Sequence, residues 1–227
     1  MIKTVLWDVD ATLLNFDKAE VASMHQCLEK YHVEMSENQF MMYKAINRTY
    51  WDRLERKEIE RETVLVERFN EFFDILGVSH IDAKVFNEDY QDALARNYFL
   101  EDGAIDTVKA LHGKVKQYVV SNGSRVAQEG KLEGSGLGAL MDGQFISEEV
   151  GYEKPDVHFF DYVKNNIHYQ PQTTLIVGDS LTSDIQGGLN ASLHTCWFNP
   201  ERLANDTTIK PEYTVDHLTK VIDLVNK

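Results

Sequence analysis

Two hydrophobic patterns alternate along the chain. Residues 4–14, TVLWDVDATLL, form an apolar run typical of a strand, which is interrupted at Asp8 and Asp10. From Phe16 to Phe99 the apolar residues instead recur with helical periodicity, and no convincing strand is found there. The sequence predicts four helices in this region, within residues 17–33, 36–58, 60–78 and 82–99.

Local signals mark two ends of these helices. Ser36 followed by Gln39 is typical of a capping box that opens the second helix. Gly77 is placed to end the third helix, because glycine adopts the left-handed conformation of a helix C-terminus without strain.

After residue 100, short β-branched runs return between helical segments. The runs are KQYVVSNG, TTLIVGDS and SLHTCWFN, at residues 116–123, 173–180 and 192–199. Strands that alternate with helices predict βαβ units and a parallel sheet. We therefore expect an α/β fold, a doubly wound parallel sheet formed by residues 1–15 and 100–227. Residues 16–99 are expected to form an all-helical cap inserted after the first strand.

Composition and charge limit the function. The 227 residues are 43% hydrophobic and 11% aromatic, as in a packed globular protein, and the net charge is −14. Such an acidic chain disfavours nucleic acid as a partner, and an anionic substrate would require local cations.

There is no apolar run of about 20 residues for a membrane span, and the N-terminus has no signal-peptide pattern. Cys27 and Cys196 lie far apart in the sequence and do not have the spacing of a metal site, so we do not expect a disulfide framework. We expect a cytoplasmic protein without a membrane partner; the sequence does not predict its oligomeric state.

Polar residues capable of catalysis follow the predicted strands. In an open α/β sheet, ligand sites form beyond the carboxyl ends of the strands. Each motif alone has an ordinary explanation, such as a surface turn or a helix cap. Their joint occurrence at strand ends favours one shared site. Its residues are Asp8, Asp10, Ser121, Asn122, Gly123, Lys154 and Asp179.

These motifs resemble those of the haloacid dehalogenase-like (HAD) superfamily. The four matching segments are DVDAT (8–12), VVSNG (119–123), EKP (153–155) and GDSLTSD (178–184). The stretch FMMYKAIN followed by Trp51, and the stretch from residue 178 to 200, are similar to the bacterial pyrimidine 5'-nucleotidase branch. One departure is Ala11, where members of the superfamily usually carry Gly, or an acidic residue in this branch.

The resemblance implies a Mg²⁺-dependent phosphatase. Asp8 would attack phosphorus as the nucleophile, and Asp10 would act as general acid and then as general base. The Asp8 carboxylate, the Asp10 main-chain carbonyl and Asp179 would hold Mg²⁺, and Asp184 would orient a ligand or a water beside it.

The remaining motifs would serve the transferred phosphoryl group. Ser121, Asn122, Gly123 and Lys154 would hold its oxygens and neutralise developing charge. Haloacid dehalogenases lack an acid at the position of Asp10, which favours phosphoryl transfer here.

Three classes of function stay open at this point. The first is a phosphatase for (pyrimidine) nucleoside monophosphates, the second a phosphatase for another small phosphorylated metabolite, and the third a non-catalytic binding protein with the same fold. The intact motif set disfavours the third class.

Two features of the cap bear on the substrate. Tyr43, Asn47 and Trp51 recur every four residues, so they share one helix face and are candidates for contacting a base. Residues with this spacing more often pack the core of a domain, which is the alternative for Tyr43 and Trp51. The charged run DRLERKEIERE, residues 52–62, is interpreted most simply as a solvated helix face.

Overall fold

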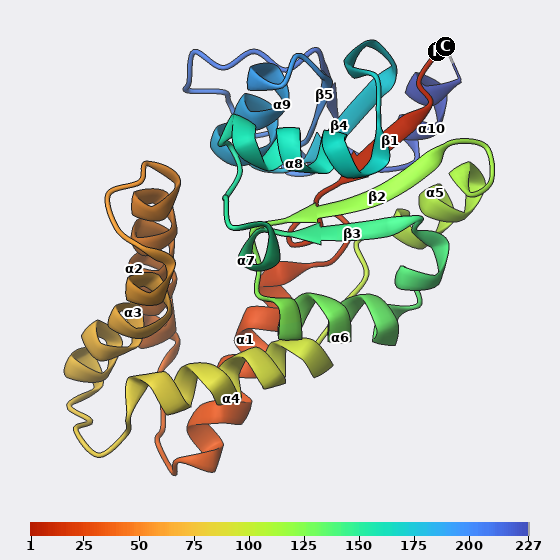
Figure 1. The fold of residues 1–227 in the computed structure, drawn as a ribbon. Helices are drawn as coiled ribbons and strands as arrows, with labels where there is room; N and C mark the ends of the chain where they lie inside the picture. Colours follow the sequence, from red (N-terminus) through yellow and green to blue (C-terminus); the bar gives the residue numbers. More distant parts are fainter. Residues whose placement is uncertain (227) are drawn as a thin grey trace.

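The computed structural model describes residues 1–226 and contains one six-stranded sheet with helices around it (Figure 1). Every strand pairs in parallel with its neighbours, in the order β3-β2-β1-β4-β5-β6. The strands are β1 (Thr4–Trp7), β2 (Lys116–Ser121), β3 (Gly143–Ile146), β4 (Thr174–Gly178), β5 (His194–Phe198) and β6 (Tyr213–Val215). The predicted α/β fold with a doubly wound parallel sheet is confirmed.

Helices cover both faces of this sheet because alternate residues of its strands point to opposite sides. The helices after the cap are α5 (Ala104–Leu111), α6 (Arg125–Ser135), α7 (Ser147–Val150), α8 (Val157–Ile167), α9 (Gln186–Asn190) and α10 (Lys220–Val225). In β1, Val5 and Trp7 join a core with α5, α6 and α10, whereas Leu6 joins a second core with α8. Figure 1 shows α8 and α9 together on one side of the sheet. Short helical turns also occur at Gly138–Leu140, Pro171–Thr173 and Leu181–Ile185.

The hydrophobic pattern did not predict the edge strands β3 and β6. They contain four and three residues, and each contacts only one neighbouring strand. β3 is only partly buried along its sequence GQFI, and β6 has the sequence YTV. In such short, half-exposed runs, too few apolar and polar residues alternate for the pattern to be distinguished from that of a loop.

Four helices lie between β1 and α5 and form the cap. They are α1 (Phe16–Lys30), α2 (Glu37–Glu55), α3 (Arg61–Leu76) and α4 (Ala83–Arg96). The Ser36–Gln39 capping box is present, and Gly77 ends α3 in the left-handed conformation with φ of 67°. The cap has its own core, which is rich in aromatic residues, and α4 also packs against α6 (Figure 1).

The two chain segments that join the cap to the sheet run side by side. Leu14 and Leu100 form an antiparallel bridge, and the Asn15 amide N–H donates to the Phe99 carbonyl at 2.7 Å. The Asn15 side chain also donates to Glu101 Oε1 at 2.7 Å. The cap is therefore attached through a short two-stranded connection.

Candidate active site

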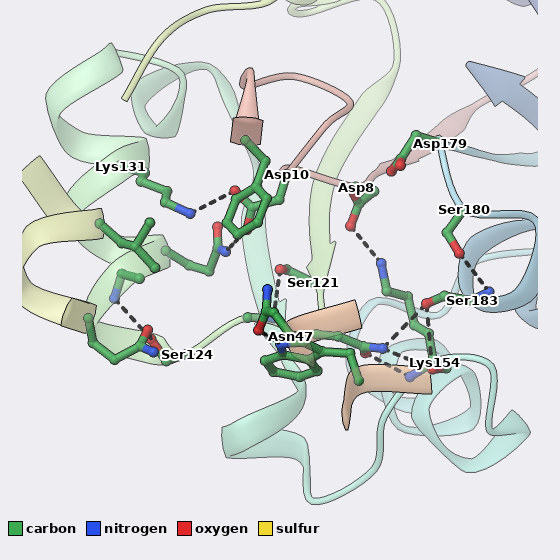
Figure 2. A pocket seen from close by; sticks show the side chains of 18 of the residues that line it. Asp8, Asp10, Asn47, Ser121, Ser124, Lys131, Lys154, Asp179, Ser180 and Ser183 are labelled. Atoms are coloured by element: carbon green, nitrogen blue, oxygen red, sulfur yellow. Dashed lines mark hydrogen bonds and ion pairs between the residues drawn. The ribbon is translucent and has the colours of Figure 1, made fainter. Parts of the chain in front are cut away.

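A cavity of about 210 Å³ lies where the carboxyl ends of β1, β2 and β4 face the cap (Figure 2). Residues from both parts of the chain line it. From the sheet side come Asp8, Asp10, Ser121, Asn122, Gly123, Lys154, Asp179 and Asp184. The structure therefore brings together every site residue that the sequence predicted outside the cap.

Three carboxylates of this site lie close together. One oxygen from each of Asp8, Asp179 and Asp184 lies within 4.8 Å of the others. Burial raises the pKa of Asp8 to about 7, and the charge of Asp184 adds to this effect while Lys154 opposes it. Burial and the two neighbouring carboxylates raise the pKa of Asp179 well above its ordinary value. The cluster is an electrostatically unfavourable arrangement that a cation would stabilise.

Lys154 connects two of these carboxylates. Its Nζ donates to Asp8 Oδ1 at 2.7 Å, to Asp184 Oδ1 at 2.6 Å and to the Val120 carbonyl at 2.8 Å. Burial alone would lower the pKa of Lys154, but the two carboxylates raise it above its ordinary value. The Asn122 side chain fixes this lysine, because its amide oxygen accepts from the Lys154 N–H and its amide nitrogen donates to the Lys154 carbonyl. Lys154 is therefore a positioned, charged donor.

The Asp10 side chain points away from the other acids, toward α6. Gln128 Nε2 donates to Asp10 Oδ2 at 2.6 Å, and Lys131 Nζ donates to Asp10 Oδ1 at 2.7 Å (Figure 2). Both α6 residues are buried and line the cavity. Sequence reasoning missed them because they carry no motif; the only signal is their spacing of three, which places both on one face of the helix.

The turn after β1 has a strained residue. Ala11 has a φ of 61°, in the left-handed region that an alanine rarely occupies. The position that the superfamily usually fills with glycine thus has the backbone conformation that glycine favours. The next residue, Thr12, donates through Oγ1 to Asp179 Oδ1 at 3.3 Å, so the turn also contacts the carboxylate cluster.

Arg61 links the cap to the predicted phosphate-binding loop. Its guanidinium donates to the carbonyls of Asn122 and Gly123, at 3.1 and 2.6 Å, and to Ser147 Oγ at 3.1 Å. Arg61 is buried, and residues 56–60 separate α2 from α3. The interpretation of residues 52–62 as one solvated helix face was therefore wrong. Charge alone did not distinguish an arginine that contacts a neighbouring loop from one that contacts water.

The helix face of Tyr43, Asn47 and Trp51 is divided between the cavity and the cap core. Tyr43 is fully buried in the core and stacks on Phe69, with ring centroids 5.7 Å apart. It does not line the cavity, whereas Asn47 and Trp51 do. Asn47 Oδ1 accepts from the half-buried Trp51 indole at 3.1 Å. The structure thus supports the packing alternative for Tyr43 and leaves Asn47 and Trp51 as candidates.

A buried polar network holds this cap wall. Asn47 Nδ2 donates to Glu20 Oε1 at 3.0 Å, and Asn47 Oδ1 also accepts from Arg68 at 2.8 Å. A second contact runs from Arg68 to Asn87 Oδ1 at 2.9 Å. Burial raises the pKa of Glu20 to about 7, although the charges of Lys44 and Arg68 partly oppose this. This network could not be predicted from the sequence, because its members come from α1, α2, α3 and α4.

The carboxylate cluster fits a hard divalent cation such as Mg²⁺. Carboxylate oxygens are the ligands that Mg²⁺ prefers, and the three acids with Lys154 carry a formal net charge that a divalent cation would balance. Of the predicted metal ligands, Asp8, Asp179 and Asp184 lie together, while the Asp10 side chain pairs with Lys131. Only the main-chain carbonyl of Asp10 was predicted to contact the metal, and that contact stays a prediction.

Comparison with known proteins agrees with these observations. The family model described as haloacid dehalogenase-like hydrolase matches residues 5–198. The chain is 34% identical to the pyrimidine 5'-nucleotidase PynA of Streptococcus pneumoniae over 99% of this chain and 95% of that protein. It is 31% identical to the pyrimidine 5'-nucleotidase YjjG of Escherichia coli over 98% and 97% of the two chains.

A solved structure has a similar fold over the whole chain. The HAD-hydrolase YfnB of Bacillus subtilis, described as bound to magnesium and as revealing interdomain movement, superposes with a TM-score of 0.93. It is 33% identical, and the match covers 100% of this chain and 99% of that one. This chain belongs to the haloacid dehalogenase-like hydrolase family.

Proposed function

We propose that this protein is a Mg²⁺-dependent phosphatase that uses Asp8 as its nucleophile. The observation that carries the proposal is the contact of Lys154 with both Asp8 and Asp184, at the edge of a cavity that also contains Asp179. The ammonium group of Lys154 holds the Asp8 carboxylate in place, and the neighbouring carboxylates suit a divalent cation. Phosphoryl transfer to an aspartate requires both of these features.

Each group has a distinct task in the proposed reaction. An oxygen of Asp8 attacks phosphorus and forms an aspartyl phosphate as the bond to the leaving oxygen breaks. Water then attacks the phosphorus and releases inorganic phosphate, which restores Asp8. Asp10 would leave its contacts with Gln128 and Lys131 to deliver a proton to the leaving oxygen, and would later take one from the water.

The phosphoryl oxygens are held by a second set of groups. We assign this task to Ser121, Asn122, Gly123 and Lys154, and the assignment is supported by the fact that each of them lines the cavity. Bound Mg²⁺, held by Asp8, Asp179 and Asp184, would supply positive charge that stabilises the transferring phosphoryl group.

The proposed substrates are nucleoside 5'-monophosphates, pyrimidine nucleotides first. Two relatives that match nearly the whole chain are named pyrimidine 5'-nucleotidases, which supports this choice. The cavity also continues from Asp8 to the half-buried Trp51 in the cap, and an indole is a surface on which a planar base can stack.

Phosphate release from a substrate panel tests both parts of the proposal. The panel contains uridine 5'-monophosphate, adenosine 5'-monophosphate, ribose 5-phosphate and an aryl phosphate, each with Mg²⁺ and with a chelator. We expect hydrolysis only with Mg²⁺, with the highest kcat/KM for the pyrimidine nucleotide. Asp8→Asn should abolish turnover, whereas Asp161→Asn, at an exposed position on α8, serves as the matched control.

The outcomes separate chemistry from specificity. Turnover that persists in folded Asp8→Asn, or that does not depend on Mg²⁺, would refute the proposed chemistry. A higher kcat/KM for ribose 5-phosphate than for both nucleotides would leave the proposed phosphatase activity intact and refute the proposed specificity for nucleotides.

A further inference from the structure

The cap contains a buried arginine whose hydrogen-bonding capacity is only partly used. Arg68 on α3 is 2% exposed, yet it lines the cavity that contains Asp8. A guanidinium has five N–H donors, and Arg68 uses one each toward Asn47 and Asn87. Its Nε has no hydrogen-bond partner among residues 1–226. Leaving a buried charged donor unpaired is costly, so the arrangement suits an acceptor that enters with a ligand.

No carboxylate balances the charge of this arginine directly. Within residues 1–226, Arg68 forms no ion pair, and both of its hydrogen-bond partners are neutral amide oxygens. Glu20 is connected to Arg68 only through the Asn47 amide, which donates to the acid and accepts from the arginine. This contrasts with Lys131 and Lys154, the two buried lysines of the cavity, which are both paired with aspartates.

The surroundings of Arg68 favour a flat ligand. Its guanidinium carbon lies 5.6 Å from the ring centroid of Tyr90 and 5.9 Å from that of Trp51, and both residues line the cavity. Asn47 fixes Trp51 and Arg68 together, because its single amide oxygen accepts from both. One N–H of its amide nitrogen donates to Glu20. Asn47 is thus a positioning residue for Trp51 and Arg68, and its second amide N–H keeps it a candidate for contacting a base.

From this geometry we infer that Arg68 is a specificity-determining residue, which donates to a ring carbonyl oxygen of the substrate's base. The inference rests on the proposed nucleotidase function and deepens it. Pyrimidine bases carry a carbonyl oxygen beside the bond to the sugar and are planar, so one ligand can meet both the guanidinium and the aromatic side chains. Adenine has no carbonyl group, so Arg68 favours pyrimidine nucleotides over adenosine 5'-monophosphate.

The test compares two substrates that differ only by the base. The kcat/KM values for uridine 5'-monophosphate and ribose 5-phosphate are measured for the wild-type protein and for Arg68→Gln. Their ratio is independent of the fraction of folded enzyme, because both substrates are measured in the same preparation. We expect the ratio to fall by about tenfold to a hundredfold, as for loss of a hydrogen bond from a charged group. If Arg68→Gln is insoluble, the same ratio of kcat/KM values is measured for Arg68→Lys, for which we expect a smaller decrease.

A control and three outcomes complete the design. Arg48→Gln, at an exposed arginine on α2, should leave the ratio at its wild-type value. An unchanged ratio in Arg68→Gln, while the wild-type protein prefers the nucleotide, overturns the inference alone. A wild-type protein without preference for the nucleotide overturns the inference and the proposed nucleotidase specificity, but not the proposed phosphatase chemistry. If the wild-type protein instead prefers a sugar phosphate bearing a carboxylate, and Arg68→Gln removes that preference, the guanidinium binds an anion and the inference is wrong.

Discussion

Glu20 should make the stability of this protein fall between pH 5 and pH 8. The side chain is 2% exposed, and burial raises its pKa from 4.5 to about 7. The folded state then binds a proton that the unfolded state has already released. The stabilisation from this proton is complete below about pH 4.5 and is lost as the pH rises through about 7. The difference in pKa corresponds to about 3 kcal/mol, of which about 2.5 kcal/mol is lost between pH 5 and pH 8.

Glu20→Gln isolates this contribution from the other titrating groups. The glutamine amide oxygen can still accept from Asn47, but the side chain does not titrate. The free energy of unfolding is measured by urea denaturation at pH 5, 6, 7 and 8 for the wild-type protein and the variant. The difference between the two proteins should change by about 2.5 kcal/mol over this range, with the variant relatively more stable at pH 8.

A matched variant tests whether burial is the cause. Glu29→Gln changes an exposed glutamate on the same helix, so it should not change the pH dependence. A difference between wild type and Glu20→Gln that is constant from pH 5 to pH 8 would refute the reasoning. It would mean that Glu20 is ionised in the folded state over the whole range.

Three further predictions concern the site. Asp10→Asn should lower kcat for uridine 5'-monophosphate by about a hundredfold or more, and less for an aryl phosphate with a good leaving group; equal losses would argue against general acid catalysis. Ala11→Gly should raise the free energy of unfolding in urea by up to about 1 kcal/mol, because it removes left-handed strain; a decrease would mean that the entropy of glycine outweighs it. Arg61→Met should raise KM about tenfold for phosphate monoesters with and without a base, because it releases the carbonyls of Asn122 and Gly123; an effect confined to nucleotides would contradict this explanation.

The sheet side of the site could be predicted because its residues follow recognisable strands. Asp8, Ser121 and Asp179 come at or just after the ends of apolar runs, and parallel strands bring their carboxyl ends to one edge. Lys154 belongs to no strand; the sequence places it with the other motifs because it precedes Pro155, which could begin the next helix, and the resemblance to a known motif supports that placement. In the structure that placement depends on Asn122, which bonds the backbone of Lys154 on both sides.

The cap side could not be predicted in the same way. Glu20, Asn47, Arg68 and Asn87 lie on four different helices, and a helical pattern does not specify which polar residue faces which neighbour. A buried charged residue looks like an exposed one in the sequence until its partners are known. Tyr43 shows the same limit for aromatic residues, since its spacing suited both the cavity and the core.

The position of β1 in the middle of the sheet has a consequence for the order of folding during synthesis. The strand is made first, yet its partners are residues 116–119 and 174–177. The cap is a continuous segment with its own core, and its ends are joined by the bridge between Leu14 and Leu100. The helices of the cap can therefore form before the apolar residues of β1 pair with β2 and β4. We expect slow, late completion of the sheet, because long-range pairing must be preceded by closure of a long loop.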